Sequence, residues 1–258
     1  MTSHMIIPDT QVAPGRTIEH LRWAGKYAAK KRPDRVIHIG DHWDMPSLSS
    51  YDIGKKCFEG RTYRRDIEAG NAGLSAFMEP IAEEQVRLAS EEGIEWNPTL
   101  DFFEGNHEYR IVKAVESDRK LEGLIGVEDF NLTQWGWKLH RFLEVVRLDG
   151  VAYSHYFTSG VMGRPVTSAR ALVTKKHMSC VMGHVQKAEV DFQYDAAGKR
   201  LTGIFAGCYY QHNEEYLNPQ GNNATWRGIW MLYNVRDGEF TMNNIPLSFL
   251  RKRFTNGS

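Results

Sequence analysis

The sequence lacks an excess of charge of either sign. Its 258 residues carry 32 Lys and Arg and 32 Asp and Glu, so the formal net charge is zero. This balance excludes a strongly basic nucleic-acid coat and an acidic tail, although it leaves room for a local basic patch. Function must therefore come from local motifs rather than from the charge of the whole chain.

Cysteines and long apolar runs are also scarce. The three Cys residues lie far apart and form no CxxC pair, unlike a disulfide framework or a cysteine-based zinc site. The apolar stretch around residues 5–7 is too short for the core of a signal peptide. No run approaches the roughly 20 apolar residues of a membrane span. We therefore expect a soluble, cytoplasmic protein with no membrane partner.

The composition that is present is that of an ordinary globular protein. Hydrophobic residues make up 41% and charged residues 25%, which allows a sizeable core. The length fits one large α/β domain or two small ones, and there is no internal repeat or low-complexity segment. We expect a single domain over residues 1–250. Within it, residues 45–98 are predicted to form a helical insertion beside the site, and residues 251–258 a flexible tail.

Five short apolar runs each end in polar residues. They lie at residues 5–7, 36–39, 100–103, 151–154 and 179–182. Short apolar runs bounded by turn residues are typical of buried strands. The polar clusters that follow are Asp9-Thr10-Gln11, Gly40-Asp41-His42-Trp43-Asp44, Glu104-Gly105-Asn106-His107-Glu108, His155 and Gly183-His184-Val185-Gln186. Ligands of α/β sheets bind at the carboxyl ends of strands, so these ends predict one shared site.

Helical periodicity lies between these runs, and strand patterns follow them. Helices are predicted over residues 16–32, 66–92, 108–124 and 167–176. Beyond residue 187, strands are predicted at 190–194, 201–206, 228–235 and 239–244, with hairpin turns at 195–199 and 237–238. The predicted fold class is mixed α/β, with a β-rich C-terminal part.

The carboxylate, amide and imidazole groups of these clusters together suit a site for two divalent ions. A carboxylate shared between two ions can hold them about 4 Å apart, as in two-metal hydrolases. Each motif is a weak signal when taken alone. Their joint order along the chain, each motif after a strand, is what predicts the site.

The ordered set DxQ, GDxxD, GNHE, a His and GHxQ resembles the motifs of the calcineurin-like metallophosphoesterase superfamily. The family pattern is DxH, GDxxD, GNH(E/D), a His and GHxH, and the match spans positions 9 to 186. Residues 207–208 and 226–228 also resemble the C-terminal part of phage-encoded members. The resemblance implies a four-layer α/β/β/α sandwich with metals at the strand ends. A phage-encoded member would act in the host cytoplasm.

The resemblance also implies a role for each matched residue. Asp41 would bridge the two ions. The remaining ligands would be Asp9, Gln11 and Gln186 at the first metal site and Asn106, His155 and His184 at the second. His107 would be the general acid that protonates the leaving oxygen. Asp44 would orient His107, or alternatively cap the loop.

The sequence departs from the family at the first metal site, because Gln11 and Gln186 stand where the family has His. Amide oxygens are harder ligands than imidazoles, which favours Mn²⁺, Mg²⁺ or Ca²⁺ over Zn²⁺ and predicts weaker binding. We expect Mn²⁺, with Mg²⁺, Fe²⁺ or Zn²⁺ as alternatives. A degenerate first site that holds no ion is the other interpretation.

The implied activity is single-step hydrolysis of a phosphate ester, and we expect a phosphodiesterase acting on nucleotides or nucleic acids. A phosphomonoesterase stays open, as does a non-catalytic module that binds phosphate or nucleic acid. Candidate phosphate-binding residues are Arg110, Arg164 and Arg170. Basic and aromatic residues mix at 51–65, which suits either a nucleic-acid strand or a solvated entry to a helix. The sequence does not indicate an oligomeric state.

Overall fold

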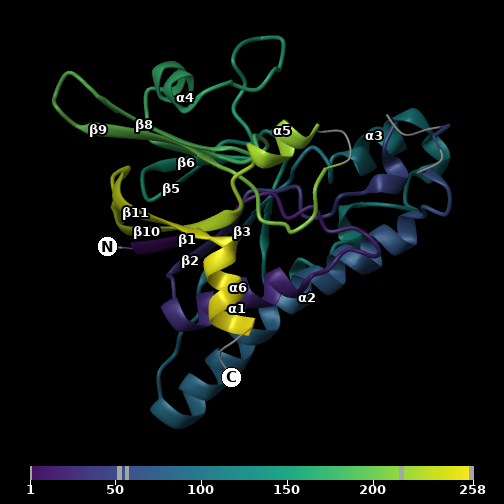
Figure 1. Ribbon diagram of the computed structural model, residues 1–258, viewed down its shortest axis with the longest axis horizontal. Helices are drawn as coiled ribbons and strands as arrows, with labels where there is room; N and C mark the ends of the chain where they lie inside the picture. The colour runs from purple at the N-terminus through teal and green to yellow at the C-terminus, as the bar shows by residue number, and fades with distance from the viewer. Residues whose placement is uncertain (1, 51–53, 56–57, 215–217, 256–258) are drawn as a thin grey trace.

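Two β-sheets form the centre of the protein (Figure 1). The computed structural model describes residues 2–50, 54–55, 58–214 and 218–255. The six-stranded sheet contains β1 (Thr2–Ile7), β2 (Arg35–His38), β3 (Thr99–Phe103), β4 (Lys138–His140), β10 (Gly228–Arg236) and β11 (Glu239–Pro246). Its order is β11-β10-β1-β2-β3-β4; β1 to β4 are parallel to one another, β10 is antiparallel to β1, and β11 is antiparallel to β10.

The second sheet has five strands and is also mixed. It contains β5 (Val146–Leu148), β6 (Val151–Ser154), β7 (Cys180–Met182), β8 (Ala188–Tyr194) and β9 (Arg200–Ala206). Its order is β5-β6-β7-β9-β8, with β6, β7 and β9 parallel to one another. The edge strands β5 and β8 run antiparallel to their neighbours. The predicted hairpin at residues 195–199 joins β8 to β9.

Helices cover the outer face of each sheet (Figure 1). The helices on the six-stranded sheet are α1 (Glu19–Lys31), α2 (Tyr63–Arg87) and α6 (Leu247–Thr255), and that on the other sheet is α4 (Ala169–Lys176). The shorter helices are α3 (Arg110–Ser117) and α5 (Pro219–Asn223). Single turns lie at Pro46–Leu48, Leu88–Glu92, Arg119–Leu121, Val127–Asp129 and Thr133–Trp135. The layers are thus α/β/β/α, which confirms the predicted fold class.

The central strands are apolar on both faces because each face meets a different core. In β1, Met5 and Ile7 pack under the helices of the six-stranded sheet, whereas Ile6 lies between the two sheets. In β7, Val181 lies between the sheets, and its neighbours Cys180 and Met182 pack under α4. Side chains alternate along a strand, so unbroken apolar runs are what a doubly covered sheet requires.

Part of the span predicted as a flexible tail, residues 251–258, is helical in the structure. Residues up to Thr255 form α6, and residues 256–258 lie outside the described part of the chain. Leu250 is fully buried, and Leu247 and Phe254 pack against the same core as α1. Three apolar residues on one helix face therefore hold this segment, despite its Lys and Arg content.

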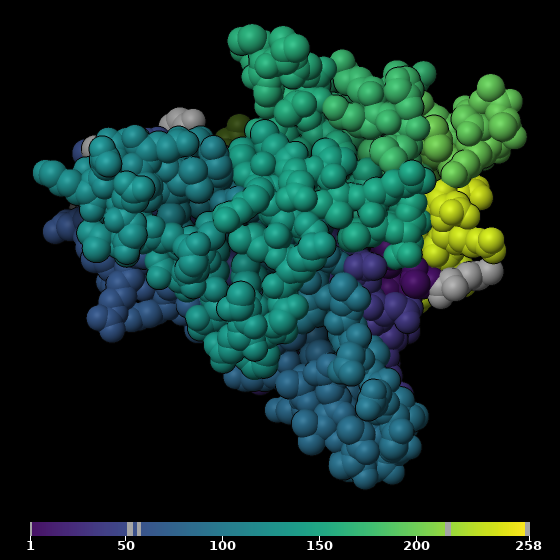
Figure 2. Space-filling view, turned by 180° about the vertical axis from the view of Figure 1, so that it is seen from behind, coloured from purple at the N-terminus to yellow at the C-terminus, as the bar shows by residue number. Residues whose placement is uncertain are grey.

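The span predicted as a helical insertion, residues 45–98, holds α2. This helix lies along α1 and buries Leu74, Phe77 and Ile81 in the core that α1 shares. The far end of α2 and the turn after it, in blue, project from the body of the molecule (Figure 2). Among the described residues, no helix has the length and apolar character needed to cross a bilayer. Cys180 and Cys208 are buried free thiols, and Cys57 is not among the described residues.

Candidate active site

The polar clusters after the five predicted strands meet at one edge of the two sheets. His155, after β6 of the five-stranded sheet, donates from Nδ1 to the carbonyl of Ile39, after β2 of the other sheet, at 2.7 Å. The backbone N–H of His184, after β7, donates to Asp9 Oδ1, after β1, at 3.0 Å. The carboxyl ends of strands from both sheets are therefore joined by direct hydrogen bonds.

Three of the predicted metal ligands form a compact group. Asp41, His155 and His184 each offer a ligand atom, and these atoms lie within 4.8 Å of one another. Asn106 Oδ1 is 3.0 Å from His155 Nε2 and 2.8 Å from His184 Nδ1. Among the described residues, this is the one place where three His, Cys, Asp or Glu ligand atoms come together in this way. The residues assigned to the second metal site are thus assembled.

The hydrogen bonds of His155 determine which ring nitrogen is available to a ligand. The Ile39 carbonyl can only accept, so the proton of a neutral His155 is on Nδ1, and Nε2 presents its lone pair. Burial lowers the pKa of His155 and lowers that of His184 to about 4, which favours neutral rings. His155 Nε2 also lies 3.5 Å from Asp41 Oδ2. Acceptor atoms that converge in this way suit a bound cation.

Two of the three residues assigned only to the first metal site, Asp9 and Gln11, carry unpaired acceptors. Asp9 Oδ2 and Gln11 Oε1 are buried, and neither has a donor among the described residues. Burial and the nearby charge of Asp41 raise the pKa of Asp9, a sign of uncompensated negative charge. Gln186 is half-buried between β7 and β8, where its carbonyl accepts from the backbone of Trp226 at 2.9 Å. The oxygen donors present at this site therefore fit a hard divalent cation.

The backbone of the site is held in uncommon conformations. Gln11, Asp41 and His184 have φ angles of 41°, 52° and 64°, in the left-handed region that most side chains avoid. Two motif glycines permit close packing, because a Cβ on Gly105 would overlap Asp41 Oδ1 and one on Gly183 would overlap Asp9 Oδ1. The glycines of GNHE and GHxQ thus let carboxylates approach the neighbouring loops.

Glu108 joins two of the motif loops. Its carboxylate accepts backbone N–H groups of Asp41 at 2.9 Å, His42 at 2.5 Å and Trp43 at 2.8 Å, all in GDxxD. It also accepts from Gly105 in its own GNHE motif, at 2.9 Å. The carboxylate is fully buried, so these four donors replace water as its partners. Glu108 therefore fixes the loop that carries Asp41.

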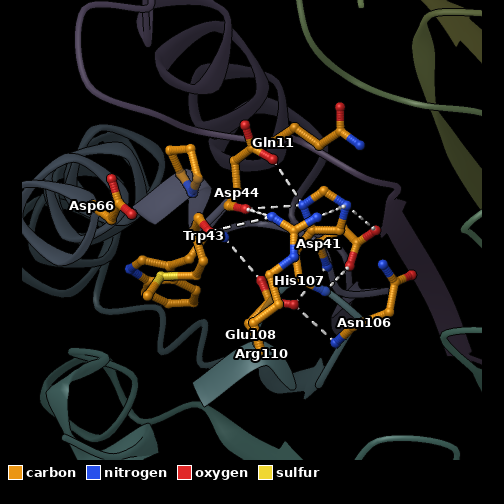
Figure 3. Close-up of polar contacts among 12 residues, drawn as sticks. Gln11, Asp41, Trp43, Asp44, Asp66, Asn106, His107, Glu108 and Arg110 are labelled. Atoms are coloured by element: carbon orange, nitrogen blue, oxygen red, sulfur yellow. Dashed lines mark hydrogen bonds and ion pairs between the residues drawn. The ribbon is translucent and has the colours of Figure 1, made fainter. Parts of the chain in front are cut away.

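His107 lies between two carboxylates (Figure 3). Its Nδ1 is 2.7 Å from Asp44 Oδ1, and its Nε2 is 3.8 Å from Asp41 Oδ2. Burial alone would lower the pKa of His107, but the charges of Asp41 and Asp44 outweigh it and raise the pKa to about 9. Burial likewise opposes ionisation of Asp44, yet His107 and Arg16 bring its pKa to about 2. His107 is therefore a protonated acid at neutral pH, and the ionised Asp44 carboxylate holds it in place.

Arg16 is a site residue that the sequence analysis missed. Its Nη1 donates to Asp44 Oδ2 at 3.1 Å and to the Gln11 carbonyl at 3.2 Å. The same nitrogen lies 2.7 Å from Nε2 of His212, which in turn is 2.8 Å from Glu214 Oε1. The available signal was its position five residues after Gln11, in the loop that leaves β1.

The three predicted phosphate-binding arginines are placed very differently. Arg110 Nη1 donates to the Asp44 carbonyl at 2.7 Å, and its Nη2 is 3.4 Å from His107 Nε2. Figure 3 shows this guanidinium between the GDxxD and GNHE loops. Arg164 and Arg170 are exposed, in the loop before α4 and on α4 itself. Arg110 is therefore the one of the three that contacts the predicted general acid.

In the basic and aromatic span at residues 51–65, several of the described side chains contact other parts of the chain. The Tyr63 hydroxyl donates to Asp129, and the ring packs against the core. Arg64 pairs with Glu68 at 2.8 Å, and Arg61 donates to the Pro46 carbonyl at 3.2 Å. Other residues of the span, Tyr51 and Lys56 among them, lie outside the described part of the chain. Arg64 and Arg65 are exposed in the first turn of α2, as the interpretation as a solvated entry to a helix expects.

Of three comparisons with known proteins, the search of solved structures gives matches. No protein-family model matches the sequence, and no curated protein is similar to it. A search of solved structures returns matches that include a crystal structure of a dimetal phosphatase from Danio rerio. The identity is 11% over 95% of this chain and 96% of that chain, with a TM-score of 0.44. The activity named there belongs to that protein. For this chain, function rests on the side chains described above.

Proposed function

We propose that this protein is a metal-dependent phosphoesterase. The observation that carries the proposal is His107, hydrogen-bonded to Asp44 beside the group of Asp41, His155 and His184. A module that only binds phosphate has no need of an acid held next to a cation site. When bound, divalent cations would neutralise phosphoryl charge and activate water for attack.

The roles of the chain's own residues follow from their hydrogen bonds. Asp44 accepts from His107 Nδ1, which directs Nε2 toward Asp41 and the space where an ester would lie. His107 Nε2 then holds the proton for the leaving oxygen. Arg110 Nη2, 3.4 Å from that nitrogen, is placed to contact a phosphoryl oxygen. Arg16 and Arg110 both contact Asp44, so they also fix the carboxylate that orients the acid.

The proposed metal complement is two ions of unequal affinity. Asp41 would bridge them. Asn106, His155 and His184 would complete the second site, and Asp9, Gln11 and Gln186 the first. The buried unpaired oxygens of Asp9 and Gln11 favour an occupied first site over a degenerate one. Mn²⁺ is the proposed ion because oxygen and imidazole donors are mixed. Metal analysis of protein purified without added metal should find one retained ion, and two equally tight Zn²⁺ ions would contradict this assignment.

The proposed substrate is a phosphodiester of a nucleotide or nucleic acid. A diester carries one negative charge, whereas a monoester carries nearly two at neutral pH. The guanidinium groups nearest His107, those of Arg16 and Arg110, are already engaged with Asp44 and with backbone carbonyls. This arrangement leaves little guanidinium charge for a dianion beyond the charge that the bound cations would supply. A phosphomonoesterase is the second candidate, since Arg110 still directs Nη2 toward the site.

Hydrolysis of two aryl phosphates tests the proposal. With added Mn²⁺, bis(4-nitrophenyl) phosphate should be cleaved faster than 4-nitrophenyl phosphate. With an ester whose leaving group is an alkoxide, His107→Ala should reduce kcat by roughly 10²- to 10⁴-fold, as expected for loss of a general acid, whereas with 4-nitrophenolate the loss should be small. Asp41→Asn should abolish turnover, and His177→Asn, at an exposed His on the end of α4, should not. Equal rates for wild type, His107→Ala and Asp41→Asn would refute the enzyme proposal.

A further inference from the structure

Three aromatic side chains form a continuous surface beside the candidate metal ligands. We call Tyr109, Phe142 and Tyr156 the aromatic wall. Tyr109 and Phe142 stack with ring centroids 4.7 Å apart and planes 23° apart. Phe142 meets Tyr156 edge-on at 5.6 Å, and Tyr156 lies 4.7 Å from the ring of His184. Phe142 in turn lies 6.3 Å from the ring of His155, so two of the three rings lie beside candidate ligands.

Two of the three rings of the wall lie outside the hydrophobic cores, and the third, Tyr156, packs against the core under α4. All three rings are half-buried, and neither Tyr109 nor Phe142 belongs to any of the three core clusters. Tyr109 follows the GNHE motif, Phe142 lies between β4 and β5, and Tyr156 follows β6. These segments leave the same edge of the sheets as the site residues. Rings gathered there from three segments suit recognition of a ligand better than support of the fold.

Hydrogen bonds fix the turn that carries Phe142, the middle ring of the wall. The backbone N–H of Phe142 donates to Glu104 Oε2 at 3.0 Å. Arg141 and Glu144 close the turn around it, through a bond from Arg141 N to the Glu144 carboxylate and one from Glu144 N to the Arg141 carbonyl, both 2.9 Å. Preorganised rings lose little freedom on binding, which favours affinity for a flat partner.

We propose that the aromatic wall binds the nucleobase of a nucleotide ester whose phosphate lies at the metal site. This inference rests on the proposed phosphoesterase function and names the chemical group next to the scissile phosphate. Every base has a π face, so stacking on such rings is tolerant of base identity. Lys113 Nζ lies 5.7 Å from the centroid of the Tyr109 ring and adds positive charge beside the wall.

Two esters with one leaving group test the wall. Thymidine 5′-(4-nitrophenyl phosphate) and ethyl 4-nitrophenyl phosphate differ in the nucleoside and share their charge and leaving group. Wild type should show a higher kcat/KM for the thymidine ester. Phe142→Leu and Tyr109→Leu, which keep apolar bulk without a flat ring, should each lower this preference by roughly tenfold. Tyr109→Phe should retain it, as should Phe249→Leu, at a ring on α6 that is 47% exposed.

A binding measurement separates failure of the wall from failure of the proposed function. A 2-aminopurine nucleotide should lose fluorescence on binding to wild type and to His107→Ala, and much less on binding to Phe142→Leu. If neither ester is cleaved but this quenching occurs, the phosphoesterase function fails and the wall stands. An ester preference that is the same in all variants, or an absence of quenching with wild type, would overturn the inference.

Discussion

At the scale of single residues, Asp44 connects the candidate acid to the positive charge around it. Its carboxylate accepts from His107 on one oxygen and from Arg16 on the other, and its carbonyl accepts from Arg110. Neither arginine could be assigned this contact from sequence, because Arg16 lies in the loop before α1 and Arg110 at the start of α3, both distant from Asp44 along the chain. The orientation of His107 therefore depends on groups from three segments.

Asp44→Asn should impair the function of His107 as general acid more than the function of the other site residues. The amide keeps the shape of the side chain but loses the charge that holds His107 protonated and oriented. Loss of general-acid assistance, of the order of 10²-fold, should appear with poor leaving groups such as alkoxides. With 4-nitrophenolate, which needs little protonation, the loss should be small. The measurement is kcat/KM over a series of leaving groups. Asp237→Asn, an exposed turn residue with φ of 51°, is the matched control. An equal loss across the series would show that Asp44 does not act through the acid.

His20 gives a prediction about stability and pH. Neither of its ring nitrogens has a hydrogen-bond partner among the described residues, and burial, with His212 and His42 nearby, lowers its pKa to about 3. An unfolded His has a pKa of about 6.5, so on acidification the unfolded chain takes up a proton that the folded chain refuses. The resulting stability is present above pH 6.5 and is lost progressively toward pH 3.

Urea unfolding at pH 7.5 and pH 5.0 measures this effect. Wild type should lose about 2 kcal/mol more than His20→Leu between these pH values, from 1.36 kcal/mol for each pH unit below 6.5. Other buried His residues titrate in both proteins and cancel in the comparison. The same pH dependence in both proteins would rule out His20 as the source.

At the scale of elements, the loops that carry the site residues are hydrogen-bonded to one another. Glu108, at the approach to α3, accepts four backbone N–H groups, three of them from the loop after β2. His42 in that loop lies 2.7 Å from Thr10 Oγ1, in the loop after β1, and donates to the Gly70 carbonyl of α2. The motif residues that are not ligands therefore hold the ligands in register.

Glu108→Gln should weaken both the fold and the metal site. One carboxylate oxygen becomes an NH₂ group that faces backbone donors, so buried N–H groups lose their acceptor. We expect a destabilisation of about 1–3 kcal/mol in urea unfolding, the cost of unsatisfied buried groups. Mn²⁺ should also bind more weakly, because Asp41 is in the released loop. Glu122→Gln, at a residue whose side chain is 70% exposed, controls for the change of charge. A wild-type unfolding midpoint and Mn²⁺ affinity in Glu108→Gln would contradict this role.

The sequence patterns predicted the strands and helices that their own residues specify. They missed the elements that depend on contacts with residues far away in the sequence. The runs at 5–7, 36–39 and 151–154 are apolar on both faces and form central strands. By contrast, β4 and β5 have three residues each and pair only because the sheet edge is already in place. The same holds for α6, whose helix depends on packing against α1. At the site, motif residues were found by type and order, whereas Arg16 and the aromatic wall become visible only where loops meet.

At the scale of the whole molecule, the candidate metal centre joins the two sheets. Asp41 and Asn106 follow strands of the six-stranded sheet, whereas His155 and His184 follow strands of the five-stranded sheet. Between the sheets lies an apolar core, and the His155–Ile39 hydrogen bond closes its edge at the site. A cation bound by both pairs would therefore link two layers that the chain itself joins through long connections.

Metal binding should consequently stabilise the whole fold. A ligand that binds only the folded state adds about 2.7 kcal/mol at a concentration a hundred times its Kd. Thermal unfolding of the metal-free protein should show a Tm that rises with added Mn²⁺ and falls again with EDTA. His155→Ala should lose most of this rise, because it removes a ligand from one of the two sheets. His177→Asn should keep it. A Tm that does not respond to Mn²⁺, Mg²⁺ or Zn²⁺ would mean that no cation links the sheets at this edge, and would refute the proposed metal centre along with the enzyme that depends on it.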